Sequence, residues 1–568
     1  MARTPRAQWS TLFLALSLGG YLLLHLWSIS WFPFVHSDEA WLASLSRRML
    51  LEGRVDATEE FFHLTPRYPH ALKTLFHLIQ APFLLYSWDI VAARLPSLLA
   101  GLGTVVLVAA GMRRMTGSLA VAGAVAAGLA LDVQFFYASH FARQEVFVLL
   151  AMAGALWWLT RGPRETAGSS GISVAPGAKP EAPSGTGKGV VPAGAIIGLT
   201  IFLHPNAFVA ALAILPWVVA RGGRSGWRRA LGRYFALLAS FAAAAVGASF
   251  LMDPGFISHY LEFGGSVGVT AGLPERVARL GEFFLKMAGR HAGTYYLPPV
   301  APQLWALPAV TAVSLAAAAI GSSRARSEGW PGPVAPAALS ALSTLLAIFL
   351  IGKYSPPILV FFFPWLYIQA GLLLDGLRRR LPRLAPLLLI LIPIASGVQL
   401  AGELPRWYPG SYDQYLSRIR EAVPRGDVVL ANLNTAFAFE PGALRVWRDL
   451  GALPARPPAR ETPTRELEAD EGEPETALLE SPLGRFLRNE KVRWVVLPVE
   501  ELELIYRNRP VWNEVYGNPH RFYPELLEIL RRYGTMTDRF EAKWYAMRLL
   551  PYMDRTPHHV EIYRLELP

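Results

Sequence analysis

TLFLALSLGGYLLLHLWSISWFPFVHSDEA, residues 11–40, joins an apolar segment directly to two adjacent carboxylates. The apolar part is long enough to cross a bilayer as a helix, and Asp38 and Glu39 stand at its far end. Carboxylates are costly to place near hydrocarbon, so a pair at the mouth of a membrane helix indicates a working site. Trp31 and Phe32 stand where a signal peptide would carry small residues before its cleavage site, so we expect the segment to remain as an uncleaved anchor.

The composition is that of a membrane protein. Of the 568 residues, 52% are hydrophobic, and the mean hydropathy of +0.29 is too high for a soluble chain. Apolar runs of about 17 to 22 residues, separated by short arginine- and glycine-rich stretches, predict a polytopic α-helical protein. The predicted spans, about eleven, are residues 10–32, 95–112, 118–135, 143–160, 190–203, 206–220, 231–251, 303–320, 335–351, 357–376 and 384–401.

The basic residues predict how these spans are oriented. With the N-terminus inside, five short loops fall on the cytoplasmic side, and each contains arginine, as the positive-inside rule requires. Counting residues 70–87 as a further span would break this pattern, so we interpret that stretch as a helix along the outer interface. Three long segments then lie outside: residues 33–94, residues 252–302 and the tail from residue 402.

The tail, residues 402–568, changes character and predicts an extracytoplasmic α/β domain. VVLAN (428–432) and VRWVVLP (492–498) are typical of buried strands. PELLEILRRYG (524–534) is typical of a helix that ends at its glycine. The acidic, proline-rich run 459–480 is expected to be a disordered surface insertion.

Residues 1–401 are expected to form the membrane domain. Within it, the outer loop 33–94 contains the acidic pair, and residues 162–189 are rich in Gly, Pro and Ser without an apolar period. We expect 162–189 to be a flexible cytoplasmic linker.

Charge and cysteine content exclude several classes of function. Zero cysteines exclude disulfides, thiolate metal sites and cysteine nucleophiles. The arginines of the inner loops explain the net charge of +11, so no nucleic-acid partner is expected. The chain contains no Walker loop, GxSxG elbow or HExxH helix. We expect no purpose-built protein metal site, whereas a divalent cation held by Asp38, Glu39 and a donor phosphate is compatible with the pattern.

The predicted topology sends polar residues from distant segments to the outer face. Carboxylates ringed by arginine, lysine and histidine suit a reaction that activates a hydroxyl and releases an anionic phosphate. The first outer segment supplies His36, Asp38, Glu39, His70, Lys73 and Arg94, and later turns supply His140, Arg143, Glu145, His204, Lys353 and Tyr354.

Several motifs follow one another in a specific order. They are HSDEAWLASLSRRML (36–50), YPHALKTLF (68–76), AARLPSLLAGLGTVVLVAAGMRRMTG (92–117), HFARQEVFVLLAM (140–152), GAIIGLTIFLHPNAFVAALAILPWVVARG (194–222) and KYSPPILVFFFPWLYIQAG (353–371). This order resembles the integral-membrane GT-C glycosyltransferases, close to the protein O-mannosyltransferase, aminoarabinose transferase and Rgt-like group. The resemblance covers roughly residues 9–400.

The resemblance implies roles for individual residues. In relatives the acidic residue of the first outer loop acts as base on the acceptor, which assigns that role to Asp38 with Glu39 as its neighbour. Arg94 matches the arginine that opens the second span, and His204 matches a side chain that faces the donor phosphate. Relatives often carry a K/H-P-P-L motif where this chain has YPHAL (68–72), so a lipid-phosphate ligand there would have to be Lys73 or the histidine of that segment.

The acidic residues also have structural interpretations. Asp38 and Glu39 suit the first turn of a helix that Ser37 would cap. Arg143 and Glu145 could form a structural pair at the membrane face, but residues two apart do not face each other on a helix, so each would need another partner.

The basic residues have structural interpretations as well. Arg94 could anchor a helix end by snorkelling, and His204 precedes a proline and could terminate the fifth span. Lys353 and Tyr354 could be interfacial anchors, and Lys73 lies on an amphipathic stretch of the kind that carries lysine by default.

The sequence predicts an inverting glycosyltransferase that takes a sugar from a polyprenyl-phosphate donor at the outer face of a bacterial inner membrane. We expect Asp38 to deprotonate the acceptor, a hydroxyl or amine. We expect Arg94, His204, Lys353, Arg143 and Lys73 to bind the donor phosphate, and His36, His70, His140, Glu145 and Tyr354 to contact the substrates. The alternatives are a transporter or flippase of lipid-linked saccharides and a catalytically inactive assembly subunit.

Overall fold

The computed structural model describes most of the chain. The residues outside the described part are 1–17, 59–67, 162–188, 267–270, 290–299, 325–331, 353, 408–411, 441, 454–474, 501, 504–521 and 543–558. The chain divides into two compact units. The first comprises Met1–Ile29, Pro69–Ile79 and Arg94–Leu404, and the second comprises Ser30–Tyr68, Gln80–Ala93 and Pro405–Pro568.

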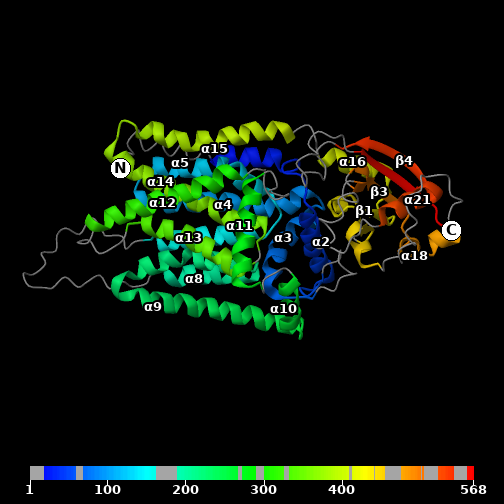
Figure 1. The fold of residues 1–568 in the computed structure, drawn as a ribbon, viewed down its shortest axis with the longest axis horizontal. Helices are drawn as coiled ribbons and strands as arrows, with labels where there is room; N and C mark the ends of the chain where they lie inside the picture. The colour runs from blue at the N-terminus through cyan, green and yellow to red at the C-terminus, as the bar shows by residue number, and fades with distance from the viewer. Residues whose placement is uncertain are drawn as a thin grey trace, which may run out of the picture. The chain divides into compact units, whose positions relative to one another are not determined.

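The first unit contains a bundle of apolar helices (Figure 1). Among the described residues, six helices are long and apolar enough to cross a membrane, or seven if a bent pair counts as one span. The six are α4 (Ile90–Thr116), the second half of α9 (Ser225–Met252), α12 (Ala301–Arg324), α13 (Val334–Ile351), α14 (Phe363–Arg380) with the 3-10 helix η5 (Pro356–Phe362) before it, and α15 (Ala385–Trp407). The bent pair is α5 (Leu119–Leu131) and α6 (Val133–His140), which meet at 65°.

Shorter helices occupy the remaining predicted spans. They are residues 18–28, α7 (Glu145–Leu159), α8 (Val190–Leu199) with η3 (Thr200–Phe202), and the first half of α9 (Ala207–Gly223). Each predicted span therefore falls on helix within the described part of the chain. The protein is a multi-pass integral membrane protein, as predicted.

The helix α9 (Ala207–Met252) folds back on itself at Gly223, whose φ of 63° and ψ of −174° are not helical. Glycine adopts a positive φ without the steric cost of a Cβ atom. The hydroxyl of Tyr234 donates a hydrogen bond to the carbonyl of Ala211 at 3.0 Å, so the two halves lie alongside each other. The predicted loop from Arg221 to Arg233 is therefore helical except at this turn.

Contacts at the C-terminal end of α7 agree with the predicted alternation of loops. Arg114, in the last turn of α4, donates a hydrogen bond to the carbonyl of Trp157 at 2.9 Å. The guanidinium of Arg161 lies 3.9 Å from the centroid of the indole ring of Trp157. Two of the predicted cytoplasmic loops, those after α4 and α7, thus begin side by side.

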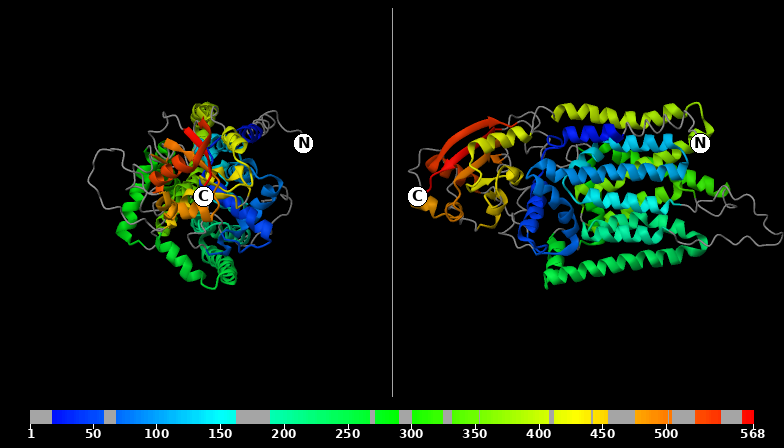
Figure 2. Two further views of the ribbon diagram at one scale, coloured as in Figure 1. Left: turned by 90° about the vertical axis from the view of Figure 1, so that its right-hand side faces the viewer. Right: turned by 180° about the vertical axis from the view of Figure 1, so that it is seen from behind.

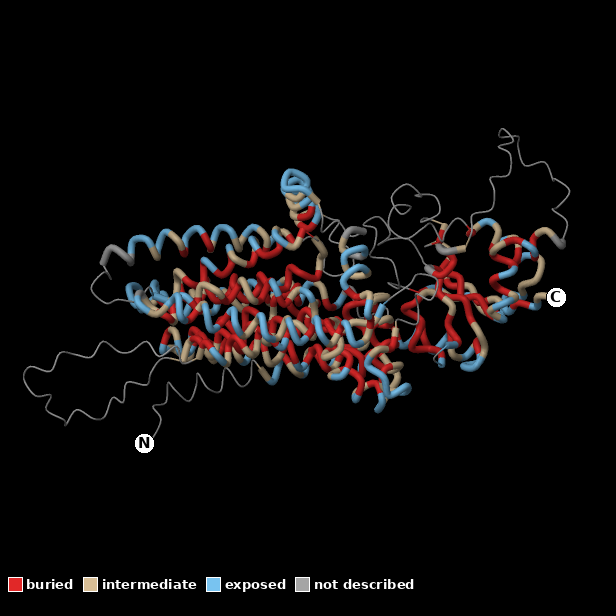
Figure 3. Tube along the Cα trace, turned by 90° about the horizontal axis from the view of Figure 1, so that it is seen from below, coloured by how far each residue is buried: buried red, intermediate tan, exposed pale blue. Residues whose placement is uncertain are grey.

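Burial separates inner helices from outer ones (Figure 3). In the most apolar window of each helix, 83% of the residues of η5–α14 are buried, against 11% for the second half of α9 and 17% for α15. These two exposed helices lie at opposite edges of the bundle (Figures 1 and 2). Their exposed side chains include Phe250, Leu251, Leu387 and Val398. Such apolar surfaces suit contact with lipid tails.

The predicted outer segments are largely helical where they are described. They contain α2 (Ser37–Glu52), η2 (Ala71–Lys73), α3 (Thr74–Tyr86), α10 (Phe256–Ser266) and α11 (Leu273–Ala288). The stretch 70–87, predicted as an interfacial helix, is helical as η2 followed by α3.

The second unit contains a five-stranded mixed sheet in the order β2-β1-β3-β5-β4. The strands are β1 (Val429–Ala431), β2 (Leu444–Val446), β3 (Trp494–Pro498), β4 (Gly534–Glu541) and β5 (His559–Leu565). β1 pairs in parallel with β2 and β3, whereas β5 pairs antiparallel with β3 and β4. The helices around it are α16 (Tyr412–Ala422), η6 (Leu433–Ala438), η7 (Trp447–Ala452), α17 (Glu475–Leu479), α18 (Pro482–Asn489) and α21 (Tyr523–Tyr533). The predictions of strands at 428–432 and 492–498 and of a helix ending at Gly534 are confirmed.

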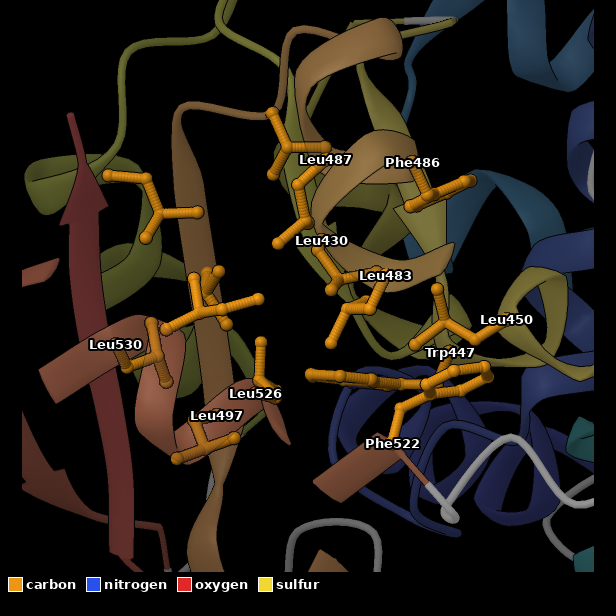
Figure 4. Close-up of a cluster of buried hydrophobic side chains, with 14 of the residues drawn as sticks. Leu430, Trp447, Leu450, Leu483, Phe486, Leu487, Leu497, Phe522, Leu526 and Leu530 are labelled. Carbon is orange, nitrogen blue, oxygen red and sulfur yellow. The ribbon is translucent and has the colours of Figure 1, made fainter. Parts of the chain in front are cut away.

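The core of this domain lies between the sheet and the helices α18 and α21 (Figure 4). Its members include Leu430, Leu497, Leu483, Leu487, Leu526 and Leu530. Leu478 of α17 belongs to the same core. Because this leucine is buried in a helix, the prediction of a disordered run over 459–480 is wrong at its C-terminal end. Residues 454–474, and residues 162–188 of the predicted linker, lie outside the described residues.

Candidate functional site

The acidic pair stands at the N-terminus of α2, in the second unit. His36 is the N-cap, and its Nδ1 accepts a hydrogen bond from the N–H of Asp38 at 3.0 Å. The carboxylate of Glu39 accepts a hydrogen bond from the N–H of His36 at 2.9 Å. This reciprocal arrangement is a capping box, and negative charge at a helix N-terminus is also favoured by the helix dipole. The cap is therefore His36 and not the predicted Ser37, because the helix begins at Ser37, one residue earlier than that prediction assumes.

The two carboxylates have different environments. Glu39 is fully buried, and its carboxylate takes part in the cap. The side chain of Asp38 is 17% exposed, and it is the N–H of this residue, not its carboxylate, that the capping box uses. The Nδ1 of His36 accepts that hydrogen bond, so its imidazole carries a proton only at Nε2 in the neutral form. Of the pair, Asp38 is the carboxylate better placed to meet a substrate.

Three of the predicted residues meet in the first unit: Arg143, Glu145 and His204. The guanidinium of Arg143 donates two hydrogen bonds to the carboxylate of Glu145, at 3.1 and 3.0 Å. The expectation that these two residues cannot face each other is wrong, because Arg143 lies in the connection before α7 and only Glu145 is helical. Both side chains are mostly buried, which strengthens a bidentate charged pair.

His204 reaches the same carboxylate from another segment. It lies between η3 and α9, where its Nδ1 accepts a hydrogen bond from the N–H of Asn206 at 3.0 Å. The neutral imidazole therefore carries its proton on Nε2, which lies 4.0 Å from Oε1 of Glu145. One carboxylate thus faces two nitrogen donors from turns that are about sixty positions apart in the chain.

Arg94 lies near the start of α4 and is fully buried. Its Nη1 donates a hydrogen bond to the carbonyl of Ile29 at 2.9 Å. A guanidinium cannot lose its charge in a protein, so this side chain is a permanent positive charge placed away from water.

The other predicted residues occupy separate places. The ring centroid of His70 lies 6.3 Å from that of Phe256 and 6.2 Å from that of Tyr260. Lys73 is half-buried at the end of η2. Lys353 lies outside the described residues.

His140 and Tyr354 are held by the helices around them. His140 is fully buried at the end of α6, with its ring 4.5 Å from that of His25 and 4.8 Å from that of Phe136. The hydroxyl of Tyr354 donates a hydrogen bond to the carbonyl of Arg276 at 3.1 Å, which ties the segment before η5 to α11.

A buried acid that sequence reasoning missed is Asp132, at the bend between α5 and α6. Its carboxylate accepts hydrogen bonds from the N–H groups of Gln134 and Phe135, both at 2.9 Å. It also accepts from Gln303 of α12 at 3.0 Å and from the hydroxyl of Tyr367 of α14 at 2.7 Å. An aspartate inside the apolar run 118–135 was the available signal, since intramembrane acids are rare and have partners.

No three histidine, aspartate or glutamate side chains of the described residues lie close enough together to hold a metal ion.

No family model matches the chain, and no curated protein matches it. Among solved structures, it is similar to ArnT from Cupriavidus metallidurans bound to undecaprenyl phosphate, with 16% identity and a TM-score of 0.50 over 76% of this chain and 84% of that one. The GT-C fold predicted from the motifs is confirmed. The chain is also similar to the Archaeoglobus fulgidus oligosaccharyltransferase in complex with Zn and sulfate, at 14% identity and a TM-score of 0.49, covering 92% and 71% of the two chains. A third structure, AglB from the same archaeon with an inhibitory peptide and a dolichol-phosphate, has 12% identity, a TM-score of 0.48 and coverage of 94% and 73%.

Proposed function

We propose that the chain is an inverting glycosyltransferase that moves a sugar from a polyprenyl-phosphate donor to a hydroxyl or amine of an acceptor. The reaction takes place on the extracytoplasmic face of a bacterial inner membrane. The observation that supports this most directly is the fold shared with ArnT, which was solved bound to undecaprenyl phosphate. A lipid donor also fits a membrane protein of this kind, because the prenyl tail can stay in hydrocarbon while the sugar phosphate reaches polar side chains.

We assign Asp38 as the general base. The acceptor oxygen or nitrogen attacks the anomeric carbon, the bond from that carbon to the phosphate oxygen breaks, and Asp38 takes the proton that the acceptor loses. Attack from the side opposite the leaving group inverts the anomeric configuration. Glu39 is the weaker candidate for this role because it is fully buried and its carboxylate caps α2.

We assign the binding of the departing phosphate to Arg143, His204 and Arg94, together with Lys73 and Lys353. Glu145 holds Arg143 through two hydrogen bonds, and the N–H of Asn206 holds the imidazole of His204, so the two donors are positioned before a phosphate arrives. Donors that are already oriented stabilise developing negative charge without reorganisation during the reaction. His36, His70, His140, Glu145 and Tyr354 remain the candidates for contacts to the substrates.

The experiment that tests the proposal measures release of polyprenyl phosphate from a radiolabelled polyprenyl-phosphate sugar, in membranes that contain the purified protein and native acceptors. Wild type and Asp38→Asn are compared, with Asp56→Asn as the matched control. Asp56 is an acid of the same outer segment that pairs with Arg54 at the surface. We expect Asp38→Asn to lower the release rate by about 10² to 10⁴-fold, the usual contribution of a general base, and Asp56→Asn to leave it unchanged.

Two outcomes would contradict the proposal. Equal release by wild type and Asp38→Asn would remove Asp38 as the base. Movement of the intact donor across the bilayer without cleavage would instead support the flippase alternative.

A further inference from the structure

A cavity of about 260 Å³ lies in the second unit, at some distance from the acidic pair. Its walls are the C-terminal half of α2, the indole of Trp88 and the segment that joins β1 to β2. The polar side chains in these walls are Ser44, Arg47, Arg48, Glu52 and Glu440.

The indole of Trp88, which forms one wall of the cavity, is held by hydrogen bonds to the C-terminal domain. Trp88 Nε1 donates to the carbonyls of Ala436 and Phe439, both at 3.2 Å, and its ring lies 4.8 Å from that of Phe437. The guanidinium of Arg47 lies over the same indole, 4.7 Å from its centroid. This stacking holds the guanidinium plane in one orientation at the cavity wall.

Arg47 has an unused hydrogen-bond donor. Its Nη1 is buried and has no hydrogen-bond partner among the described residues. Its Nη2 lies 3.9 Å from the carboxylate of Glu440, which is beyond hydrogen-bond distance. The neighbouring Arg48, by contrast, donates to Glu52 at 2.6 Å. Nη1 has almost no accessible surface, so the part of Arg47 that can meet a ligand oxygen in the cavity is Nη2, which is too far from Glu440 for a hydrogen bond.

We propose that this cavity binds an oxyanion, a carboxylate or a phosphate ester, carried on a small hydroxylated molecule such as a monosaccharide derivative. The planar guanidinium of Arg47 matches the geometry of either anion. The carboxylates of Glu52 and Glu440 can accept hydrogen bonds from hydroxyl groups, and Leu51 and Phe439 line the remainder with apolar surface. The volume lies just below the usual range of about 300–1,000 Å³ for ligand pockets, which suits one sugar-sized molecule.

The cavity is a site separate from the proposed base. Arg47 lies nine residues after Asp38 in α2, which corresponds to about 14 Å along the helix axis and half a turn around it. A molecule bound at Arg47 therefore contacts another side of α2, and its binding does not depend on sugar transfer by Asp38.

Isothermal titration calorimetry of the full chain in nanodiscs tests this proposal. The probes are methyl β-D-glucuronide, glucose 6-phosphate, inorganic phosphate and the neutral methyl β-D-glucoside. We expect at least one charged sugar to bind and the neutral sugar to bind at least tenfold more weakly. Binding of the glucuronide alone would indicate a carboxylate ligand, and binding of the phosphate ester alone would indicate a phosphate ligand.

The variant Arg47→Gln should bind the charged probe at least tenfold more weakly than wild type does. Arg54→Gln is the matched control, because Arg54 is an exposed arginine just after α2 that pairs with Asp56 and does not line the cavity. The proposal is overturned if no charged sugar binds at millimolar concentration, if the neutral sugar binds equally well, or if Arg47→Gln binds like wild type. Should Arg47→Gln fail to fold, the comparison of charged and neutral probes on wild type still decides.

Discussion

Arg143 and Glu145 face each other through two hydrogen bonds, of 3.1 and 3.0 Å, although they are only two positions apart. The contact forms because the arginine precedes α7 and the glutamate is its first residue. The same carboxylate lies 4.0 Å from His204 Nε2, so one buried acid holds Arg143 by hydrogen bonds and faces His204 without a direct hydrogen bond. Losing that acid would leave both donors without their common partner.

The variant Glu145→Gln should lower kcat/KM for the polyprenyl-phosphate sugar by about 10- to 100-fold. Hydrogen bonds to charged groups contribute about 1.5–3 kcal/mol, and about 1.4 kcal/mol corresponds to tenfold in rate. Initial rates of polyprenyl phosphate release measure the effect. Glu275→Gln is the control, because Glu275 pairs with Arg279 on an exposed helix surface. Equal losses in the two variants would argue that charge alone, and not this contact, matters.

Glu39, the capping acid of the outer pair, should contribute to the stability of the protein. Glu39→Gln keeps an oxygen that can accept from the N–H of His36, so its thermal unfolding midpoint should stay close to that of wild type. Glu39→Ala removes the acceptor and should destabilise the protein by about 0.5–2 kcal/mol, as other cap losses do. Thermal unfolding in detergent measures both variants. A midpoint for Glu39→Ala equal to that of Glu39→Gln would exclude the capping role.

The sequence was sufficient for most spans because many of the apolar runs are long and end at arginines, as in the run that becomes α4. It was also sufficient for β1 and β3, which are buried along their whole length and read as continuous apolar runs. The strand β4 was missed because it is mostly exposed at the sheet edge and carries polar residues such as Thr535 and Asp538. The alternation of apolar and polar residues in HVEIYRL is typical of a half-buried strand, and this segment becomes β5.

The site was predicted less completely than the fold, since contacts between distant turns depend on packing. Nothing in the spacing of Glu145 and His204 indicates that they meet. The Arg143–Glu145 pair depended on where α7 begins, and helix boundaries are the least certain part of a sequence-based prediction. The run 118–135 predicts one continuous span and so gives Asp132 no special place, whereas the chain bends there by 65°.

The bend at Asp132 leads to a prediction about stability. Asp132→Ala leaves two backbone N–H groups, the Gln303 amide and the Tyr367 hydroxyl without their acceptor. Each buried donor left unsatisfied costs about 1–3 kcal/mol, so this variant should unfold at a clearly lower temperature than wild type. Asp132→Asn keeps one oxygen for the backbone groups and should lose less.

Thermal unfolding in detergent measures both Asp132 variants. The control is Ser240→Ala, because Ser240 is exposed and its hydroxyl donates to the carbonyl of Ala236 in its own helix. Surface changes of this kind usually stay within about 0.5 kcal/mol of wild type. An Asp132→Ala protein as stable as Ser240→Ala would show that the bend does not depend on this network.

The C-terminal domain should lose stability in acid through Glu500. Burial acts to raise the pKa of Glu500, but hydrogen bonds from the side chain and the N–H of His559, at 2.5 and 2.7 Å, outweigh it and hold the pKa below its ordinary value of 4.5. Between the lowered pKa and about 4.5 the unfolded chain binds more protons than the folded one, so stability rises with pH in that window. The contribution is complete above pH 4.5 and is lost as pH falls through the folded-state pKa.

Hydrogen exchange of the β5 amides, corrected for the intrinsic rate at each pH, measures this contribution in wild type and Glu500→Gln. The two proteins should differ most above pH 4.5, where the wild-type carboxylate is charged, and should converge as the pH is lowered below it. Glu480→Gln provides a control from the same domain, because the side chain of Glu480 is 61% exposed and pairs with Arg488, and this variant should differ little from wild type. A difference between wild type and Glu500→Gln that stays constant from pH 3 to 7 would mean that the glutamine disturbs packing and that the charge on Glu500 contributes nothing to holding β5 in the sheet.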